Sequence, residues 1–365
     1  MNHAYCLGVQ CKMRMKAAIF EHQGIVNVCD RKIPKLGDYD LLVKIHFCGI
    51  CGTDLHIYEG QVPFVKYPLI GGHEFSGKIT NIGSKVEEFS IGEKIAVNPN
   101  LSCKDKGLRG DDYCYYCKKN RPHFCTNWHA LGVTQNGGFA EYVICPSTSA
   151  VKVPKEVSLK NALFMEPIAC CIHGLNRLNI QATDTILVLG AGPIGLLMVS
   201  LIKSLYRSKV IVSELNSSRR ILASNLGADL VIDPREYSLA DIVYDETEKQ
   251  GVDISIEAVG SCRTAIDAIE LLNRGGKSLI FGVSPPEETV KIKLFEIYNK
   301  EISLFGSFTN PHENHEALEL LRNNIIDPSK IISHEFSIEN LEKGLLLMRN
   351  ITSDVKKIII NNELK

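Results

Sequence analysis

The chain of 365 residues is 45% hydrophobic and 23% charged, and its 41 Lys and Arg residues nearly balance its 42 Asp and Glu residues. This composition suits one large or two smaller globular domains and excludes an intrinsically disordered protein. The balanced charge argues against a nucleic-acid-binding protein and a polybasic membrane patch, and no apolar run reaches the roughly 18 residues of a membrane-spanning helix.

The 13 cysteines are the unusual feature of the composition. The N-terminal residues lack the apolar core of a secretory signal, so we expect a cytoplasmic protein without a disulfide framework, although Lys12 and Arg14 leave an organelle-targeting segment as an alternative. Metal ligands and buried thiols explain the cysteines better. Residues 1–14 are expected to form an extension before a first strand at 15–19.

Residues 15–168 are rich in short strand patterns. Apolar runs separated by glycine, proline and asparagine clusters predict strands at 41–47, 78–82, 94–97 and 140–145. No long helical period interrupts them, so we expect a compact, barrel-like first domain.

A first group of possible metal ligands is spread through this domain. Cys51 follows an apolar strand, His73 and Glu74 lie in GGHEFSG, and Glu166 lies in FMEPIACC. One thiolate, one imidazole and carboxylates can hold zinc and still leave room for a substrate. Cys48 could form a redox or metal pair with Cys51, but it falls on the apolar strand, and we assign it to packing.

A second group is local, in a lobe at 98–130. Cys114, Cys117 and Cys125 have the spacing C-x2-C-x7-C, and Cys103 lies eleven positions before Cys114. Four thiolates can form a closed tetrahedral zinc site, and the polar surroundings suggest that the metal replaces a missing core. Four unrelated buried cysteines are the alternative.

From 169 to 307, apolar strands alternate with helical stretches. Strands are expected at 185–189, 209–212, 230–232, 254–256, 278–281 and 301–305, and helices at 194–205 and 217–226. This alternation predicts an α/β domain whose parallel sheet is covered on both faces. The segment 308–365 holds predicted helices at 315–322 and 341–348 and a strand at 357–360.

A glycine-rich turn opens this second domain. Gly190, Gly192 and Gly195 form G-x-G-x-x-G between an apolar strand and an apolar helix, which is typical of dinucleotide binding. The first glycine permits the tight turn, the second lets a pyrophosphate approach, and the third lets helix and strand pack closely. The remaining residues of the motif next to the phosphates are Pro193 and Ile194.

Cofactor choice is indicated at the end of the next strand. Glu214 lies 24 residues after Gly190, where a carboxylate can bind both ribose hydroxyls of NAD and repel the 2′-phosphate of NADP. We therefore expect NAD, although Arg219 nearby could tolerate that phosphate. The apolar strand at 301–305 would be the last of the sheet, and its edge suggests a homodimer or homotetramer.

These motifs together resemble the zinc-containing medium-chain dehydrogenase/reductase family. Residues 72–86, GHEFSGKITNIGSKV, match its zinc signature G-H-E-x2-G-x5-G-x2-V. Glu166, where simple alcohol dehydrogenases carry a cysteine, and the runs VNPNLSC and HALGVTQNGGFAEY look like its polyol dehydrogenase branch, with arabitol and sorbitol types. The resemblance implies a chaperonin-10-like β-barrel catalytic domain, a doubly wound (Rossmann) nucleotide domain, and a last segment that returns to the catalytic domain.

The resemblance also implies residue roles. Cys51, His73 and one of Glu74 or Glu166 would hold a catalytic zinc, and the other glutamate would reach it through water. Thr53 and His56 match a proton-relay hydroxyl and its solvent-side acceptor, with a loop cap and a solvated histidine as alternatives. Zinc lowers the pKa of bound water from about 16 to about 7, so we expect it to help a polyol lose a proton while NAD accepts hydride and a ketose forms.

Two segments depart from the family pattern. The loop between Cys103 and Cys114 is eight residues longer than usual, but a longer loop costs only about 0.6 kcal/mol per doubling of its length, so we expect two zinc ions per chain. GSFTNPHEN replaces the Arg-Tyr pair of sorbitol dehydrogenases, which favours an arabitol-like substrate. A polyol phosphate, threonine and butanediol are alternative substrates, and a non-catalytic relative is the alternative to an enzyme.

Overall fold

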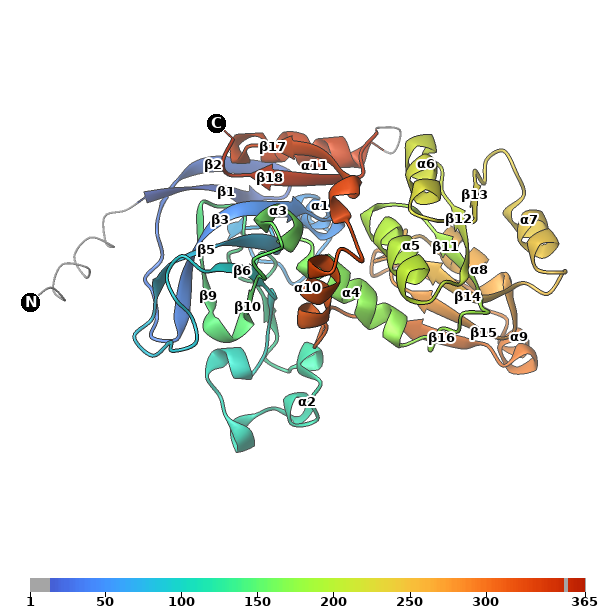
Figure 1. Ribbon diagram of the computed structural model, residues 1–365, viewed down its shortest axis with the longest axis horizontal. Helices are drawn as coiled ribbons and strands as arrows, with labels where there is room; N and C mark the ends of the chain where they lie inside the picture. Colours follow the sequence, from blue (N-terminus) through green and yellow to red (C-terminus); the bar gives the residue numbers. More distant parts are fainter. Residues whose placement is uncertain (1–13, 351–353, 365) are drawn as a thin grey trace, which may run out of the picture. The chain divides into compact units, whose positions relative to one another are not determined.

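Two structural units divide the chain in the computed structural model, which describes residues 14–350 and 354–364 (Figure 1). The first unit contains the described chain up to Glu166 and again from Asn310 onward, and the second runs from Pro167 to Thr309. Of the predicted extension at 1–14, only Arg14 lies among the described residues, and it begins the first strand instead.

β-strands are the main regular elements of the first unit. The longest sheet has the order β10-β6-β5-β3-β18-β17, with β9 also paired to β3, and a smaller sheet has the order β2-β1-β4. The strands are β1 Arg14–His22, β2 Ile25–Lys32, β3 Asp40–Ile50, β4 Leu69–Ile70, β5 Glu74–Ile82, β6 Lys94–Val97, β7 Asn100–Leu101, β8 His129–Ala130, β9 Tyr142–Pro146, β10 Ala150–Lys152, β17 Ile332–Phe336 and β18 Lys357–Asn361.

An early strand and a late strand of the chain pair in this unit. β18, drawn in red, pairs antiparallel with β3, drawn in blue, and Ile359 lies opposite Gly49 (Figure 1). The core between the sheets buries Phe20, Phe75 and Phe139, and Cys48 belongs to it, as predicted for a packing residue. The helices are α1 Gly52–Tyr58, α2 Tyr115–Lys118, α3 Leu159–Ala162, α10 Asn314–Arg322 and α11 Leu341–Arg349, and α4 Met165–Asn176 crosses the unit boundary.

A parallel sheet forms the centre of the second unit and confirms the predicted α/β fold. Its order is β13-β12-β11-β14-β15-β16, so the chain proceeds from β11 to one edge and then from β14 to the other. The strands are β11 Thr185–Leu189, β12 Lys209–Ser213, β13 Leu230–Ile232, β14 Val252–Glu257, β15 Leu272–Ile280 and β16 Ser303–Gly306. Sheets of this type bind ligands where the order reverses, at the carboxyl ends of strands such as β11 and β14.

The helices of this unit are α5 Pro193–Leu205, α6 Ser217–Asn225, α7 Leu239–Glu246, α8 Cys262–Glu270 and α9 Leu294–Lys300. Sequence patterns located α5 and α6, whereas α7, α8 and α9 were not predicted. The strand expected at 301–305 begins two residues later, because α9 extends to Lys300 and Glu301 has φ +52° at its C-cap. None of the helices in the described part of the chain combines the length and apolarity needed to cross a membrane.

Candidate metal centres and dinucleotide site

Cys51 lies at the junction of β3 and α1 in the first unit. β3 ends at Ile50, and Cys51 has an extended backbone (φ −106°, ψ 160°) as the N-cap of α1. Its side chain is half-buried, and its Sγ lies 3.8 Å from Oγ1 of Thr53. The strand–helix junction therefore holds the sulfur beside a hydroxyl group.

Asp54 is fully buried and connects two loops by hydrogen bonds. Its Oδ2 accepts the N–H of Cys51 at 2.9 Å, and its Oδ1 accepts the N–H of Gly72 at 3.1 Å. Oδ1 also lies 3.6 Å from Nδ1 of His73. Gly72 has φ +83°, and a Cβ there would lie 2.8 Å from Sγ of Cys48, so the loop before His73 requires glycine.

Ligand atoms of Cys51, His73 and Glu74 converge, and we call this group the mixed-ligand centre. All of these atoms lie within 4.8 Å of one another, and both His73 and Glu74 are buried. Burial disfavours a charged imidazole, but the negative charges of Asp54 and Cys51 outweigh it and raise the pKa of His73 well above its usual value. A metal cation would replace that proton, because a metal-bound imidazole is neutral. One sulfur, one nitrogen and one oxygen donor suit zinc.

Glu74 also forms a buried ion pair with Lys357 of β18. The two side chains are only 1% and 3% exposed. Burial opposes the charge of Lys357, but the carboxylate of Glu74 and the thiolate of Cys51 outweigh it and raise the pKa of the lysine. The pair fits because Gly49 has no side chain: a Cβ there would lie 2.1 Å from Oε2 of Glu74. The Glu74 carboxylate therefore pairs with Lys357 and also contributes a ligand atom to the mixed-ligand centre.

Glu166 is buried in the first turn of α4. Its backbone carbonyl accepts a hydrogen bond from Nδ2 of Asn310 at 3.2 Å, and Oδ1 of Asn310 accepts one from Asn100 at 2.9 Å. Among the described residues, the mixed-ligand centre does not extend to Glu166. Of the two glutamates that the sequence left unranked, Glu74 is the one whose ligand atom joins Cys51 and His73.

The two residues expected to relay protons lie one turn apart on α1, so their side chains are neighbours on the helix surface. Thr53 faces the Cys51 sulfur, and Nδ1 of His56 lies 2.6 Å from Oε1 of Gln61. Both side chains are half-buried. The structure therefore brings Thr53, but not His56, to a ligand of the mixed-ligand centre by a direct contact.

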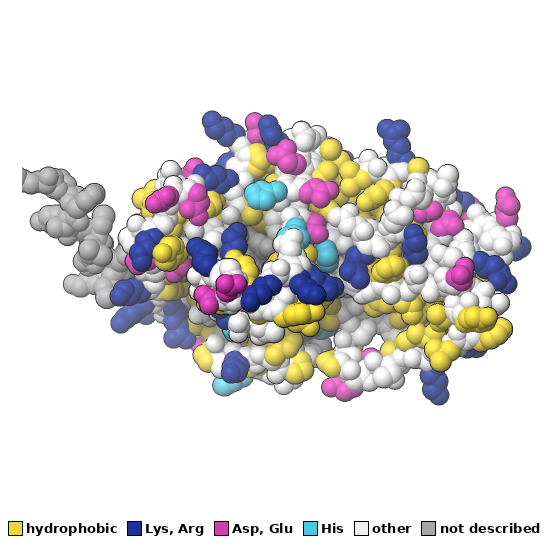
Figure 2. Space-filling model, turned by 90° about the horizontal axis from the view of Figure 1, so that it is seen from below, with side chains coloured by type: hydrophobic (Ala, Val, Ile, Leu, Met, Phe, Trp, Pro, Cys, Tyr) yellow, Lys and Arg dark blue, Asp and Glu magenta, His cyan; other side chains and the backbone are white. Residues whose placement is uncertain are grey.

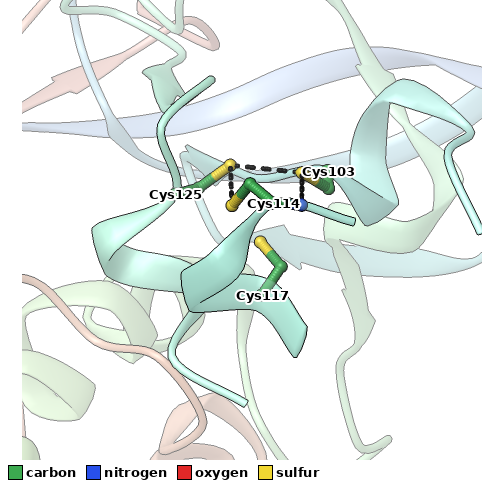
Figure 3. A group of neighbouring side chains, drawn as sticks. All are labelled: Cys103, Cys114, Cys117 and Cys125. Atoms are coloured by element: carbon green, nitrogen blue, oxygen red, sulfur yellow. Dashed lines mark hydrogen bonds between the residues drawn. The ribbon is translucent and has the colours of Figure 1, made fainter. Parts of the chain in front are cut away.

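The four cysteines of the lobe form a second group, the four-cysteine centre (Figure 3). Their side chains point toward one another, and all four Sγ atoms lie within 4.8 Å. Sγ of Cys125 is 3.5 Å from that of Cys103 and 3.8 Å from that of Cys114. A tetrahedron with metal–sulfur bonds of about 2.3 Å has edges of about 3.8 Å, so the spacing suits zinc. Burial opposes ionisation, yet backbone N–H groups at Cys117 and Thr126 lower the pKa of Cys114 to about 5.

The unusually long loop between Cys103 and Cys114 is ordered by one carboxylate. Asp105 accepts hydrogen bonds from the N–H and Oγ of Ser102 at 2.7 and 2.9 Å, and from Oγ1 of Thr148 at 2.7 Å. Short 3-10 helices at Lys104–Lys106 and Gly110–Asp112 take up the additional residues. The sulfurs therefore converge despite the insertion, as expected.

The glycine-rich turn joins β11 to α5 in the second unit. Gly190 has φ +95°, and a Cβ on Gly195 would lie 2.0 Å from the carbonyl oxygen of Gly190. A Cβ on Gly192 would meet nothing within 4 Å, so the backbone at the N-terminus of α5 is open to a phosphate. Pro193 and Ile194 form the first turn of this helix. The turn therefore fits a dinucleotide.

Glu214 follows β12 and reaches this turn. Its Oε2 accepts the N–H of Ala191 at 2.7 Å, and its Oε1 accepts the N–H of Asn216 at 2.8 Å. Glu214 is buried and belongs to the same corner of the sheet as Gly190. Arg219 lies in the first turn of α6, where its N–H donates to Oδ1 of Asn216.

Sequence patterns did not single out Lys357, Arg220, Asp233 or Arg235. The only signal for Lys357 is a charged residue at the start of the apolar strand KIIIN. Asp233 follows β13 directly, at the carboxyl end of a strand in the nucleotide-binding sheet. Charged side chains at such positions are candidates for a ligand site.

Comparison with known proteins identifies the family. Residues 37–155 match the alcohol dehydrogenase GroES-like domain, and residues 193–323 match the zinc-binding dehydrogenase domain. The chain belongs to the zinc-containing medium-chain dehydrogenase family, with a GroES-like domain and a Rossmann-type nucleotide domain.

Individual relatives differ in what they act on. The starvation-sensing protein RspB of Escherichia coli K12 is 33% identical over 95% of this chain and 99% of its own length. An L-threonine 3-dehydrogenase of Pectobacterium atrosepticum is 30% identical, covering 96% of this chain and 94% of the relative. D-arabinitol dehydrogenase 1 of Uromyces fabae is also 30% identical, covering 91% and 93%.

Two solved structures differ in their bound cofactor. A Sinorhizobium meliloti 1021 protein bound to NADP superposes with a TM-score of 0.89 at 34% identity, covering 96% of this chain and 100% of the other. The RspB protein of Escherichia coli CFT073, in complex with NADH, gives a TM-score of 0.87 at 30% identity, covering 95% and 99%. Neither the substrate nor the choice between NAD and NADP follows from family membership alone.

Proposed function

We propose that this protein is a zinc- and NAD-dependent dehydrogenase that oxidises a secondary hydroxyl of a sugar alcohol, of the arabitol, xylitol or sorbitol type, to a ketose. The observation that carries the proposal is the convergence of Cys51, His73 and Glu74, a mixed donor set of the kind found at catalytic zinc sites. A zinc ion held there supplies Lewis acidity to the substrate hydroxyl.

The protein's own residues orient the ligand loops, balance the charge of the site and move protons. Asp54 accepts hydrogen bonds from the Cys51 and Gly72 backbone and so fixes both ligand loops. Lys357 neutralises one charge of a site that otherwise gathers a thiolate and a carboxylate. The Thr53 hydroxyl can accept and donate at once, so we assign it the first proton transfer, and His56 the transfer to solvent.

Glu74 is our proposed third ligand because its ligand atom joins those of Cys51 and His73. Glu166 would then reach the zinc through water, which is the role that the sequence left open for one of the two glutamates. Zinc content separates these roles. Glu74→Gln should lower the zinc content at the mixed-ligand centre more than Glu166→Gln does, and the reverse order would assign Glu166 as the ligand.

NAD is the proposed cofactor because Glu214 is buried beside the glycine-rich turn. A carboxylate in this place can bind ribose hydroxyls and repels a 2′-phosphate. Glu214→Ala should weaken NADH binding by about tenfold, which corresponds to one charged hydrogen bond, and should weaken NADPH binding less. A fluorescence titration with both cofactors measures this, and an unchanged NADH/NADPH ratio would contradict the assignment.

Two substrate classes have specific support. Glu166 within MEPIACC and the 30% identical D-arabinitol dehydrogenase support a polyol. The equally similar L-threonine 3-dehydrogenase supports threonine as the second candidate. A screen of arabitol, xylitol, sorbitol, ribitol, their phosphates, threonine and butanediol, each with NAD and NADP, separates them by the rate of reduced-cofactor formation. A rate with threonine alone would overturn the polyol proposal.

Self-association is proposed at the β16 edge of the sheet. β16 is the last strand in the sheet order, and the helix before it exposes Leu294 and Tyr298 by 81% and 80%. Figure 2 shows apolar side chains gathered at the lower right of the view, on the side of the second unit where Figure 1 places α9. An unpaired edge beside an apolar patch suits two-fold pairing. Light scattering of the purified protein should give a dimer or tetramer, and a monomer would contradict this.

A further inference from the structure

Two arginines donate to backbone carbonyls at or next to Glu214, the proposed ribose-binding residue, and one buried carboxylate pairs with both. Arg220 of α6 donates from Nη1 to the carbonyls of Glu214 and Leu215, at 2.8 and 2.7 Å. Arg235 donates from Nη2 to the carbonyl of Leu215 at 2.6 Å. Asp233 links them: its Oδ2 is 2.9 Å from Nη1 of Arg220 and 2.6 Å from Nη2 of Arg235.

The Asp233 carboxylate is fully engaged by these partners. Its Oδ1 accepts the Nε–H and the backbone N–H of Arg235, at 2.9 and 3.0 Å. The hydrogen bonds from Arg235, opposed by burial and assisted by the charge of Arg220, hold the pKa of Asp233 well below its usual value. Asp233 is 3% exposed, whereas Arg235 is 61% exposed. One end of the network is therefore a permanent buried anion, and the other is an arginine at the surface.

This arrangement bears on cofactor choice. Guanidinium groups are the preferred partners of phosphates, because their N–H donors match phosphate oxygens. Arginines next to Glu214 would be expected to attract the 2′-phosphate of NADP and so oppose the preference that Glu214 provides. Asp233 already occupies the Nε and Nη2 donors of Arg235 and contributes a compensating negative charge.

We propose that Asp233 is a specificity-determining residue, which keeps Arg220 and Arg235 from binding the 2′-phosphate and thereby supports the selection of NAD. The proposal rests on the dinucleotide site of the proposed function. It adds a second acidic residue, one that acts through two arginines rather than by contact with the ribose.

The test compares binding of NADH and NADPH by fluorescence titration, without substrate, in the zinc-loaded protein. Asp233→Asn keeps the shape of the side chain and removes its charge. Because a freed guanidinium would attract the 2′-phosphate even at a surface-like dielectric, we expect NADPH binding to tighten by at least about tenfold. NADH binding should change by less than about threefold, and added salt should reduce the gain for NADPH.

The matched control is Asp229→Asn. Asp229 directly precedes β13, at the opposite end of that strand from Asp233, where it pairs with Lys203 and accepts the N–H of Val210. The Asp229→Asn variant should leave the ratio of NADH affinity to NADPH affinity unchanged. The double variant Asp233→Asn/Arg235→Met should lose most of the gain in NADPH binding. Equal changes for both cofactors in Asp233→Asn, or a gain that persists when Arg220 and Arg235 are both replaced as well, would overturn the proposal.

A second variant remains informative even if Asp233→Asn does not fold. Arg235 is largely exposed, so Arg235→Met should fold, and it should leave NADPH binding within about threefold of the parent protein because Asp233 already holds this arginine. A loss of tenfold or more would show that Arg235 binds the phosphate despite Asp233, which contradicts the proposal. If the parent protein binds neither cofactor, the proposed function itself fails; if it binds NADH and the variants do not separate the cofactors, only the role of Asp233 fails.

Discussion

The two metal centres span similar lengths of chain but differ in what holds their ligands in place. The four-cysteine centre is local, and its outermost ligands, Cys103 and Cys125, are 22 positions apart. The mixed-ligand centre joins Cys51 after β3 to His73 and Glu74 at the start of β5, and it adds Lys357 from β18 near the other end of the sequence. The first centre depends on one loop, whereas the second depends on the assembled sheet.

The two centres also differ in their donor atoms. Four thiolates close a tetrahedron and leave no position for a substrate, which is typical of a structural zinc. The mixed-ligand centre offers three donors of different kinds, and one of them is shared with a buried lysine. We infer that the four-cysteine centre stabilises a polar lobe, while the mixed-ligand centre needs support from its surroundings to keep its ligands in place.

The largest effect that separates the centres should come from Cys51→Ser. Loss of the metal's Lewis acidity is worth several kcal/mol, so turnover should fall by a factor on the order of 10³ or more. Zinc content should fall from two to one per chain, while NADH binding should be retained because the glycine-rich turn belongs to the other unit. Cys29→Ser is the matched control, since Cys29 lies on β2 outside both groups. Retention of both zinc ions and of full activity would exclude Cys51 as a ligand.

Lys357→Met tests whether the mixed-ligand centre needs the buried ion pair between Lys357 and Glu74. Removing one partner of a buried ion pair leaves an uncompensated charge and costs about 3–5 kcal/mol of unfolding free energy. The loss should be smaller in zinc-loaded than in zinc-stripped protein, because the metal cation partly replaces the lysine charge beside Glu74. Denaturant unfolding of both forms measures the difference.

Lys356→Met is the control for that experiment, because Lys356 pairs with the exposed carboxylate of Asp354. The Asp354 side chain is 71% exposed, and an ion pair with a solvent-exposed partner contributes no more than about 1 kcal/mol. A Lys357→Met variant as stable as Lys356→Met would mean that Glu74 does not need its lysine.

A smaller effect is expected at the four-cysteine centre, where Asp105 orders the loop between Cys103 and Cys114. Asp105→Ala should cost about 1–3 kcal/mol, because the Ser102 and Thr148 groups that it accepts from lose their partner. A chelator should then remove zinc faster from the lobe, without a matching loss of activity. Asp111→Ala, at an exposed position of the same loop, is the control and should release zinc at the parent rate. Equal rates for the two variants would show that the long loop needs no anchor.

The sequence predicted local features well and long-range ones poorly. The four cysteines, the glycine-rich turn and Glu214 lie within short segments whose spacing reflects their geometry, and the structure brings each group together. The strands 185–189 and 230–232 were predicted with their observed bounds, because buried parallel strands are continuous apolar runs.

Two side-chain contacts that depend on strand pairing were not predicted from the sequence. Lys357 reaches Glu74 only because β18 pairs with β3, and Asp233 reaches Arg220 only because β13 lies beside β12. Whether Glu74 or Glu166 joins the ligand group likewise depends on tertiary packing. The helix α9 was missed because its apolar residues, such as Tyr298, are exposed and form no buried face. The helix α8 was overlooked although its buried residues, Ala268 and Ile269, belong to an amphipathic pattern.

Zinc X-ray absorption, combined with metal analysis of the purified protein, tests the pair of centres most directly. Two zinc ions per chain, one with four sulfur ligands and one with a single sulfur, should give an average of about 2.5 sulfur atoms per zinc at about 2.3 Å, with nitrogen and oxygen at about 2.0–2.2 Å. Cys51→Ser should raise that average to four while halving the zinc content. One zinc ion per chain with four sulfur ligands in the parent protein would contradict a metal at Cys51, His73 and Glu74.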